Sequence, residues 1–265
     1  MIRTRIITAV LLGGVLIAVV MFSPTPVAAA VLGALWVVGA WEWAGLARLT
    51  DGGRLVYAVG CGACMLALFY LADARVTLLV LGLALLAWLL AFAAVLRYPL
   101  KFSMATVGAA GFVALVPSWL LLTRLHGNGP LGHELAMTVL AIVWAADIGA
   151  YTFGRAFGRI KLAPAVSPGK TWEGVSGGVI AAAAAAWAAA AWVGLPTGAL
   201  VATGIATALV SVVGDLAVSA LKRNVGLKDT GTLLPGHGGV MDRIDSLTAA
   251  IPIFVLGLML AGIAR

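Results

Sequence analysis

The 265-residue sequence carries very little charge. Asp, Glu, Lys and Arg make up 10% of its residues, whereas 63% are hydrophobic and the mean hydropathy is +1.10. Soluble domains usually contain about 25% charged residues, so this chain lacks the polar surface that a water-soluble fold of its size needs. The scarcity of charge therefore excludes a soluble domain and indicates that lipid surrounds most of the chain.

Reactive sulfur and imidazole groups are also scarce. Cys61 and Cys64 form a C-x-x-C spacing, but they lie inside an apolar run without a second pair or a nearby His. This context argues against redox or zinc chemistry, and both cysteines are expected to be small buried residues. The net charge is +7, yet the positive residues are scattered singly between apolar runs. That pattern is typical of residues that set membrane topology, so no nucleic-acid partner is expected.

Long apolar runs recur along the whole sequence. A helix needs about 20 apolar residues to cross a hydrocarbon core of about 30 Å, and nine such spans are predicted. Their approximate ranges are 6–22, 27–47, 55–72, 76–96, 103–124, 134–154, 173–194, 197–220 and 247–264. The predicted fold is an all-α polytopic integral membrane protein with about nine transmembrane helices. About five spans form an N-terminal region, 1–125, and four spans with two polar loops form a catalytic region, 126–265.

The distribution of Lys and Arg predicts the orientation in the membrane. With the N-terminus in the cytoplasm and nine alternating spans, only Arg75, Arg124 and Arg265 of the 17 Lys and Arg residues fall outside. This asymmetry follows the positive-inside rule and places the C-terminus outside. The two longest polar loops, 155–172 and 221–246, are then both cytoplasmic, so the functional site is expected on that face.

Two acidic residues lie within otherwise apolar spans. Asp147 and Asp215 are near the predicted cytoplasmic ends of the sixth and eighth spans, and Tyr151 follows Asp147 by one helical turn. An Asp at the centre of a membrane helix costs about 2.5–3.5 kcal/mol, and less near the interface, so it is retained for pairing, ion binding or chemistry. A structural ion pair would explain either residue alone. Two of them beside two polar loops favour a functional site.

Helical spacing adds further polar groups to this region. Asp215, Ser219 and Lys222 are four and three residues apart, so they lie on one face of the eighth span. Asp242 and Asp245 would share a face if the segment before the last span is helical. Carboxylates at a membrane boundary, with few His and no usable Cys, suit a hard cation such as Mg²⁺.

Basic residues alternate with these acids. They are Lys170, Lys222, Arg223, Lys228 and Arg243. Carboxylate-bound Mg²⁺ together with Lys and Arg is the usual combination for phosphoryl or nucleotidyl transfer. The sequence thus predicts chemistry on a phosphate-containing substrate.

A glycine-rich segment adds a possible phosphate contact. Gly238 and Gly239 follow His237 and would let backbone N–H groups approach phosphates closely. A structural role for His237 and a role in phosphate contact or acid–base chemistry both stay open. Residues 168–171 read Pro-Gly-Lys-Thr, like the end of a P-loop, but Pro164 occupies the required first glycine position, which excludes that motif.

Three sequence blocks resemble one enzyme family. The main block reads Ser219-x-Leu221-Lys222-Arg223-x₄-Lys228-Asp229-x-Gly231-x₂-Leu234-Pro235-x-His237-Gly238-Gly239-Val240-x-Asp242-Arg243-Ile244-Asp245. It resembles the defining motif of the phosphatidate cytidylyltransferases, also called CDP-diacylglycerol synthases, without a departure. Two shorter blocks resemble the same family: Trp144-x-x-Asp147-x-x-Ala150-Tyr151-x-x-Gly154-Arg155-x-x-Gly158 and Ser167-Pro168-x-Lys170-Thr171-x-Glu173-Gly174. The blocks cover the C-terminal half of the chain.

The resemblance implies a reaction and a set of site residues. CTP and phosphatidic acid would give CDP-diacylglycerol and pyrophosphate with Mg²⁺, and a monovalent cation such as K⁺ could assist. The family's metal-site aspartates map onto Asp215 and Asp242, with Asp147 as a further candidate. The other residues implied for catalysis are Lys222, Arg223, Lys228, Asp229, His237, Arg243 and Asp245. Those implied for substrate binding are Tyr151, Ser167, Lys170, Thr171, Glu173, Ser219, Gly238 and Gly239. A homodimer in the membrane lipids of a bacterial inner membrane is also implied.

Other membrane proteins fit parts of the pattern. An ion-coupled transporter would explain intramembrane acids, but it predicts acids near the midplane and inverted repeats, and neither is evident. The CDP-alcohol phosphotransferase pattern D-x₂-D-G-x₂-A-R-x₈-G-x₃-D-x₃-D is absent. A CTP-dependent polyprenol or phytol kinase stays open, because those proteins share a related polar C-terminal region.

Overall fold

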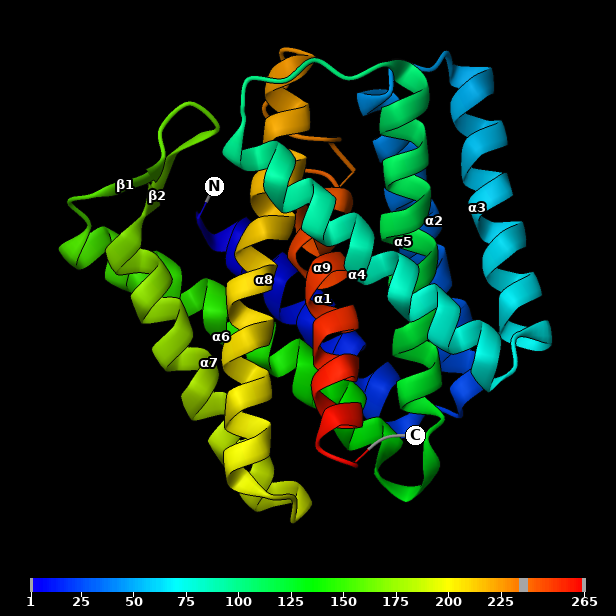
Figure 1. Cartoon of the computed structure of the whole chain (residues 1–265), viewed down its shortest axis with the longest axis vertical. Coiled ribbons are helices and arrows are strands. Elements are labelled where there is room, and N and C mark those ends of the chain that lie inside the picture. The colour runs from blue at the N-terminus through cyan, green and yellow to red at the C-terminus, as the bar shows by residue number, and fades with distance from the viewer. Residues whose placement is uncertain (1, 234–237, 264–265) are drawn as a thin grey trace.

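The computed structural model describes residues 2–233 and 238–263, with side chains from Leu11 onward. Within these residues the chain forms nine α-helices, one short 3₁₀ turn and two short strands (Figure 1). The helices are α1 (Ile2–Phe22), α2 (Thr25–Leu46), α3 (Asp51–Leu71), α4 (Ala74–Leu96), α5 (Met104–His126), α6 (Gly132–Phe157), α7 (Trp172–Val193), α8 (Thr197–Asn224) and α9 (Met241–Leu260). Each overlaps one predicted span, so the predicted all-α fold is confirmed.

Eight of these helices, α2 to α9, are long and apolar enough to cross a membrane. In α1 the described apolar part, Leu11–Phe22, is shorter. Helices suit this environment because all their backbone hydrogen bonds are internal, which a hydrocarbon core demands. The protein is therefore an integral membrane protein.

Several helices begin where a side chain can replace a missing backbone acceptor. Thr50, Asp73, Ser103 and Thr171 accept a hydrogen bond from the backbone N–H three residues later, at the starts of α3, α4, α5 and α7. Such caps satisfy one of the four N–H groups that every helix leaves free at its N-terminus. The turn signals seen in the sequence therefore coincide with real helix boundaries.

The polar loop before α9 is shorter than predicted. α8 continues to Asn224 and α9 begins at Met241, so the loop spans 225–240 instead of 221–246. Charged residues end an apolar run, but a helix continues wherever its backbone hydrogen bonds can form. Asp242 and Asp245 are consequently both helical, as the shared-face hypothesis required.

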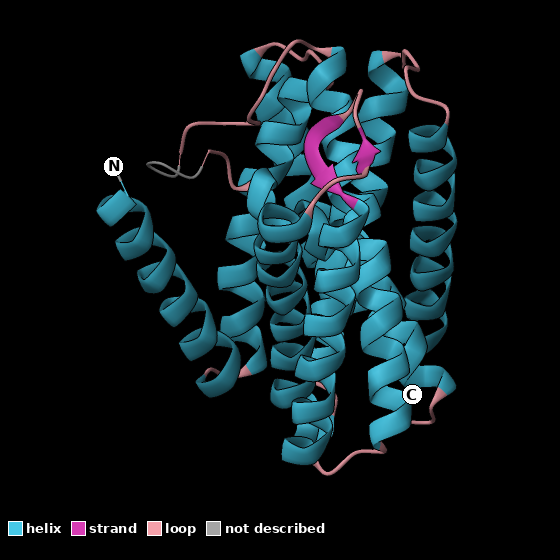
Figure 2. Ribbon diagram, turned by 90° about the vertical axis from the view of Figure 1, so that its left-hand side faces the viewer, coloured by secondary structure: helices cyan, strands magenta, loops and turns pink. Residues whose placement is uncertain are grey.

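The other polar loop contains a β-hairpin that the sequence analysis did not predict. Strand β1 (Lys161–Ala163) pairs antiparallel with β2 (Ser167–Thr171), and Lys161 lies opposite Thr171. The hairpin is drawn in magenta in Figure 2. Its strands are too short to give a clear alternating pattern, so the sequence alone predicts a loop here.

Connections gather at the two ends of the bundle. The α2–α3 and α4–α5 connections, the hairpin and the α8–α9 loop lie at one end, which is the top in Figure 1. The α5–α6 and α7–α8 connections lie at the opposite end. The predicted site residues of the two polar loops that the structure describes therefore belong to one end of the molecule.

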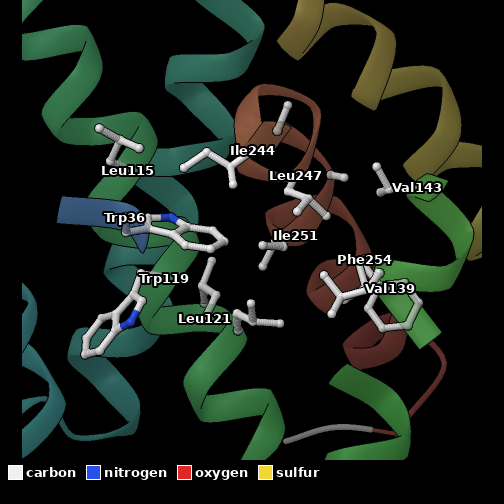
Figure 3. Close-up of a cluster of buried hydrophobic side chains, with 14 of the residues drawn as sticks. Trp36, Leu115, Trp119, Leu121, Val139, Val143, Ile244, Leu247, Ile251 and Phe254 are labelled. Atoms are coloured by element: carbon white, nitrogen blue, oxygen red, sulfur yellow. The ribbon is translucent and has the colours of Figure 1, made fainter. Parts of the chain in front are cut away.

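Helix α9 lies at the centre of the hydrophobic core. Figure 3 shows its side chains facing residues from α2, α5 and α6: Ile244, Leu247, Ile251 and Phe254 of α9 with Trp36, Leu115, Leu121, Val139 and Val143. In α5 and α9, 61% of the most apolar stretch of the helix is buried, whereas in α3 and α4 the buried share is 17%. The last two therefore form the periphery.

Small residues let the C-terminal helices approach closely, as the Ala-rich seventh span predicted. A Cβ on Gly149 of α6 would lie 2.6 Å from the carbonyl oxygen of Gly177 in α7. Similarly, a Cβ on Gly214 of α8 would lie 2.6 Å from the carbonyl oxygen of Asp245 in α9. Such contacts replace hydrophobic driving force in membranes. The second one brings Asp215 beside the acidic start of α9.

Candidate active site

A cavity of about 1070 Å³ opens among α1, α2, α6, α7, α8, α9 and the hairpin. One part of its wall is apolar, with Leu12, Leu16, Leu32 and Leu35 from α1 and α2. The other part carries most of the predicted site residues: Asp147, Tyr151, Ser167, Lys170, Thr171, Asp215, Lys222, Asp229, Asp242, Arg243 and Asp245. The cavity thus combines a charged wall with a lipid-like wall, the lining that an amphiphilic substrate requires.

Asp215 lies on the cavity face of α8 and connects that helix to the hairpin. Its Oδ2 is 2.7 Å from the Nζ of Lys170 in β2, and its Oδ1 accepts a hydrogen bond of 3.1 Å from the Ser219 hydroxyl. The predicted stripe on α8 is therefore real, because Ser219 turns toward Asp215 one helical turn away. Lys170 comes from a different element and is brought there by the hairpin.

Asp242 is the most fully bonded carboxylate of the cavity wall. Its Oδ1 accepts a hydrogen bond from Lys222 Nζ at 2.7 Å, and both side chains of this ion pair are at most 10% exposed. Its Oδ2 accepts the backbone N–H groups of Thr230 at 2.9 Å and Gly239 at 3.0 Å. Asp242 therefore joins α8, the α8–α9 loop and the first turn of α9.

The remaining carboxylates form an electrostatic network with these two pairs. Asp215 repels the charges of Asp147 on α6 and of Asp245 on α9, while Lys170 attracts both. Asp147 also interacts with Arg243, and Asp245, which is 6% exposed, accepts a hydrogen bond from the Ser246 N–H at 2.7 Å. Carboxylates this close together repel one another unless positive charge compensates them. Lys170, Lys222 and Arg243 supply positive charge here.

The donor set fits a hard divalent cation. Among the cavity-lining residues that the structure describes, the side chains that could hold a cation offer oxygens of Asp, Ser, Thr and Tyr, which Mg²⁺ prefers to nitrogen or sulfur. Among the described residues no three His, Cys, Asp or Glu side chains already form a metal-binding group. Instead Asp215 and Asp242 each hold a lysine. The predicted magnesium site at Asp215, Asp242 and Asp147 stays a prediction.

Other predicted residues hold the hairpin and its neighbours in place. Glu173, in the first turn of α7, accepts the Ile160 N–H with both carboxylate oxygens at 3.2 Å. Arg223 donates from Nε to the Val166 carbonyl between the strands at 3.3 Å. Thr171 caps α7 through the Gly174 N–H at 3.1 Å. These contacts position Lys170, which lies between them in the chain.

The rest of the predicted set lies in or near the α8–α9 loop. Lys228 and Asp229 are exposed, and Asp229 faces the cavity. Gly238, with φ of +80°, adopts a backbone conformation that favours glycine, and Gly239 N–H binds Asp242. His237 lies outside the described residues. Tyr151 is the predicted site residue that lies away from this loop, on α6, where its hydroxyl accepts a hydrogen bond from Arg155 at 3.0 Å.

Sequence reasoning missed one buried acid, Glu42 in α2. Its side chain accepts hydrogen bonds from the Thr230 hydroxyl and from the backbone N–H groups of Val240 and Met241. The signal was available, because Glu42 lies in an otherwise apolar span, the same criterion that singled out Asp147 and Asp215. The three motif blocks do not extend into the N-terminal spans, so they give no reason to assign Glu42 to the site.

Comparison with known proteins agrees with this geometry. The model of the cytidylyltransferase family matches residues 3–261. A phosphatidate cytidylyltransferase of Pseudomonas aeruginosa is 44% identical over 99% of this chain and 98% of its own length. A protein of the same name from Haemophilus influenzae is 39% identical over 96% of this chain and 97% of its own. One from Brucella suis is 45% identical over 56% of this chain and 55% of its own length.

Proposed function

This chain belongs to the cytidylyltransferase family, and we propose that it joins CTP to phosphatidic acid, giving CDP-diacylglycerol and pyrophosphate. One observation carries the proposal beyond the family name. A single cavity has Lys170, Lys222 and Arg243 beside aspartates on one wall and leucines on another. A triphosphate needs the first wall and a diacyl lipid needs the second, so both substrates fit one cavity.

The basic residues are proposed to bind phosphate groups, and the aspartates are proposed to hold these basic residues in place. Lys170 and Lys222 are held at 2.7 Å by Asp215 and Asp242, so their ammonium groups are fixed before any substrate arrives. Preorganised cations can hold two anionic substrates together and stabilise charge in the transition state. Lys170, Lys222 and Arg243 are proposed to bind the triphosphate and the lipid phosphate.

The chemical step is a displacement at phosphorus. An oxygen of the lipid phosphate, already anionic near neutral pH, attacks the α-phosphorus of CTP. A new P–O bond forms, the bond between the α-phosphorus and the bridging oxygen to the β-phosphate breaks, and pyrophosphate leaves with its electron pair. No proton has to be removed from the attacking oxygen, which is consistent with a cavity wall that carries carboxylates and ammonium groups.

A divalent cation would be held by Asp215 and Asp242, with Asp147 nearby. When bound, Mg²⁺ neutralises phosphate charge and stabilises the leaving pyrophosphate. The chain's own residues then keep the ligands in place: Ser219 orients Asp215, and the Thr230 and Gly239 N–H groups orient Asp242. A K⁺ requirement and a homodimer stay predictions from the family resemblance.

The site is proposed to face the cytoplasm of a bacterium, across the inner membrane from the C-terminus. Two observations support this orientation. The connections that hold most of the Lys and Arg residues lie at the same end of the bundle as the hairpin and the α8–α9 loop (Figure 1). CTP is also made in the cytoplasm, so the charged end must be reachable from there.

One assay tests the proposed reaction directly. Purified protein in detergent is incubated with phosphatidic acid, Mg²⁺ and CTP that carries label either in the cytosine or in the γ-phosphate. Cytosine label is expected in the lipid phase, and γ-label is expected in free pyrophosphate. Transfer of γ-label to a polyprenol, supplied in a parallel incubation, would instead identify a CTP-dependent lipid kinase, and absence of both products would refute the proposal.

A further inference from the structure

The N-terminal half of the chain contributes one acidic side chain to the α8–α9 loop. Glu42 is 4% exposed and lies near the C-terminal end of α2, just before its last turn. Its Oε1 accepts the Val240 N–H at 3.1 Å, and its Oε2 accepts the Met241 N–H at 2.7 Å and the Thr230 hydroxyl at 2.9 Å. Both carboxylate oxygens are therefore used as acceptors, and all three donors lie in or beside the loop before α9.

The position of Glu42 is not explained by its own helix. A carboxylate near the C-terminal end of a helix gains no stabilisation from the helix dipole, whose negative end lies there. The same carboxylate lies at the positive N-terminus of α9, whose N-cap residue Val240 provides no side-chain cap. Glu42 thus caps a helix to which it does not belong, and satisfies N–H groups that would otherwise be buried without acceptors.

The loop backbone closes tightly around this carboxylate. A Cβ on Gly231 would collide with Glu42 Oε1, and a Cβ on Gly239 would collide with Glu42 Oε2 and the Thr230 hydroxyl oxygen. Any larger residue at either glycine would push the loop away from Glu42. Two glycines of the motif are therefore required by a residue that lies outside all three motif blocks.

Glu42 and Asp242 both bind the same pair of loop segments. Thr230 gives its hydroxyl to Glu42 and its backbone N–H to Asp242. On the returning segment, Gly239 gives its N–H to Asp242, and the next residue, Val240, gives its N–H to Glu42. Neither segment can shift without changing the bonds of both carboxylates.

We propose that Glu42 is a positioning residue for nucleotidyl transfer: by holding Thr230, Val240 and Met241, it fixes the loop that orients Asp242 and, through Asp242, the ammonium group of Lys222. The catalytic part of this inference rests on the function proposed above. Its structural part, the ordering of the loop by an acceptor from α2, can be measured without turnover.

The decisive variant is Glu42→Gln, which keeps the shape but replaces one acceptor oxygen with an NH₂ group. That group would face a backbone N–H, which cannot accept a hydrogen bond. Displacements of about 1 Å in an active site can reduce rates by about 10²-fold, so kcat is expected to fall by about that factor, with a smaller change in KM for CTP. Glu42→Asp keeps two acceptor oxygens and is expected to retain more activity than Glu42→Gln.

The matched control is Glu134→Gln. Glu134 is a second, partly buried acid in a membrane helix, in the first turn of α6 at the opposite end of the bundle. The Glu134→Gln variant is expected to have a kcat within about twofold of the wild type. Near-normal kcat in Glu42→Gln would overturn the proposal, as would an activity loss shared equally by both variants.

Hydrogen exchange separates this inference from the proposed reaction. In detergent and without substrate, Glu42→Gln is expected to speed amide exchange in peptides covering 228–243, while exchange in α6 and α7 stays unchanged. Unchanged exchange at 228–243 refutes the positioning role even if activity falls. Faster exchange in Glu42→Gln, together with a wild-type protein that transfers no CMP, would uphold the loop ordering and refute the proposed function.

A second variant covers the case in which Glu42→Gln does not fold. Thr230→Val removes one donor to Glu42 and keeps the side-chain shape and the backbone N–H to Asp242. It is expected to lower kcat by about three- to tenfold and to raise exchange over the same peptides. Wild-type kcat together with wild-type exchange in Thr230→Val would contradict the coupling between the two carboxylates.

Discussion

Helices α1–α5 and helices α6–α9 contribute differently to one bundle. The C-terminal helices and the hairpin carry the ion pairs of the cavity and approach one another through glycines, whereas the peripheral α3 and α4 direct most of their apolar surface outward. The division is not complete. Trp88 of α4 donates to the Thr248 carbonyl of α9 at 3.0 Å, and α2 supplies Glu42 to the α8–α9 loop.

This difference separates the helices that carry the charged residues of the cavity from the helices that hold those residues in place. Most charged residues that line the cavity come from α6, α8, α9 and the hairpin, while α1 and α2 complete the apolar wall of the cavity and α2 holds the loop. Substitutions in the C-terminal region should therefore remove turnover itself. Substitutions in the N-terminal region should act indirectly, by shifting the site residues or loosening their packing. Among these substitutions, those at Glu42 are expected to have an unusually large effect on turnover.

The largest effect is expected from Asp215→Asn and Asp242→Asn. Each removes a negative charge that pairs with a lysine and is proposed to hold the metal. Losses of transition-state stabilisation at such sites reduce kcat by about 10²–10³-fold or more. We expect turnover to fall below detection in the CTP assay while gel filtration in detergent shows an intact protein.

Asp51→Asn gives the matched control, because Asp51 is an exposed acid at the start of α3. Its activity should equal that of the wild type. The comparison between the two regions fails if Asp51→Asn is as inactive as the variants in α8 and α9, or if Asp215→Asn or Asp242→Asn keeps near-normal turnover.

Lys222→Met and Asp242→Asn should both reduce stability, because each removes one partner of the same buried ion pair. The Lys222–Asp242 pair is almost fully buried, and removing one partner of such a pair typically costs about 3–5 kcal/mol because the other charge remains without compensation. The thermal midpoint of unfolding in detergent is expected to drop by several degrees.

Lys101→Met is the corresponding change in the N-terminal region. Lys101 is exposed between α4 and α5, and exposed charges contribute little, so its midpoint should stay close to that of the wild type. Equal midpoints for Lys222→Met and Lys101→Met would mean that the buried pair contributes nothing to stability.

The sequence predicts the helices and the acids of this protein better than it predicts their partners. Apolar runs locate all nine helices because lipid imposes a minimum length and excludes charge. Helical spacing correctly places Ser219 beside Asp215 and puts Asp242 and Asp245 on one helix, since those relations are local.

Long-range contacts could not be predicted in the same way. The pairing of Lys170 with Asp215 depends on a short hairpin that has no clear pattern, and that of Glu42 with Val240 joins residues 198 positions apart. No periodicity relates such residues, because the fold of the whole bundle brings them together. An intramembrane acid such as Glu42 shows that a partner exists, but not which one.

Glycine substitutions give the smallest effects and the sharpest test of packing. A Cβ at Gly214 would lie 2.6 Å from the Asp245 carbonyl oxygen, so Gly214→Ala should force α8 from α9 and cost about 1–3 kcal/mol. Around Gly82 in α4 nothing lies within 4 Å of an added Cβ. Because alanine favours the helix, Gly82→Ala should be neutral or stabilise by up to about 1 kcal/mol. If Gly82→Ala destabilises the purified protein as much as Gly214→Ala does, α4 packs against another protein surface instead of lipid, and the contrast between the two regions does not hold there.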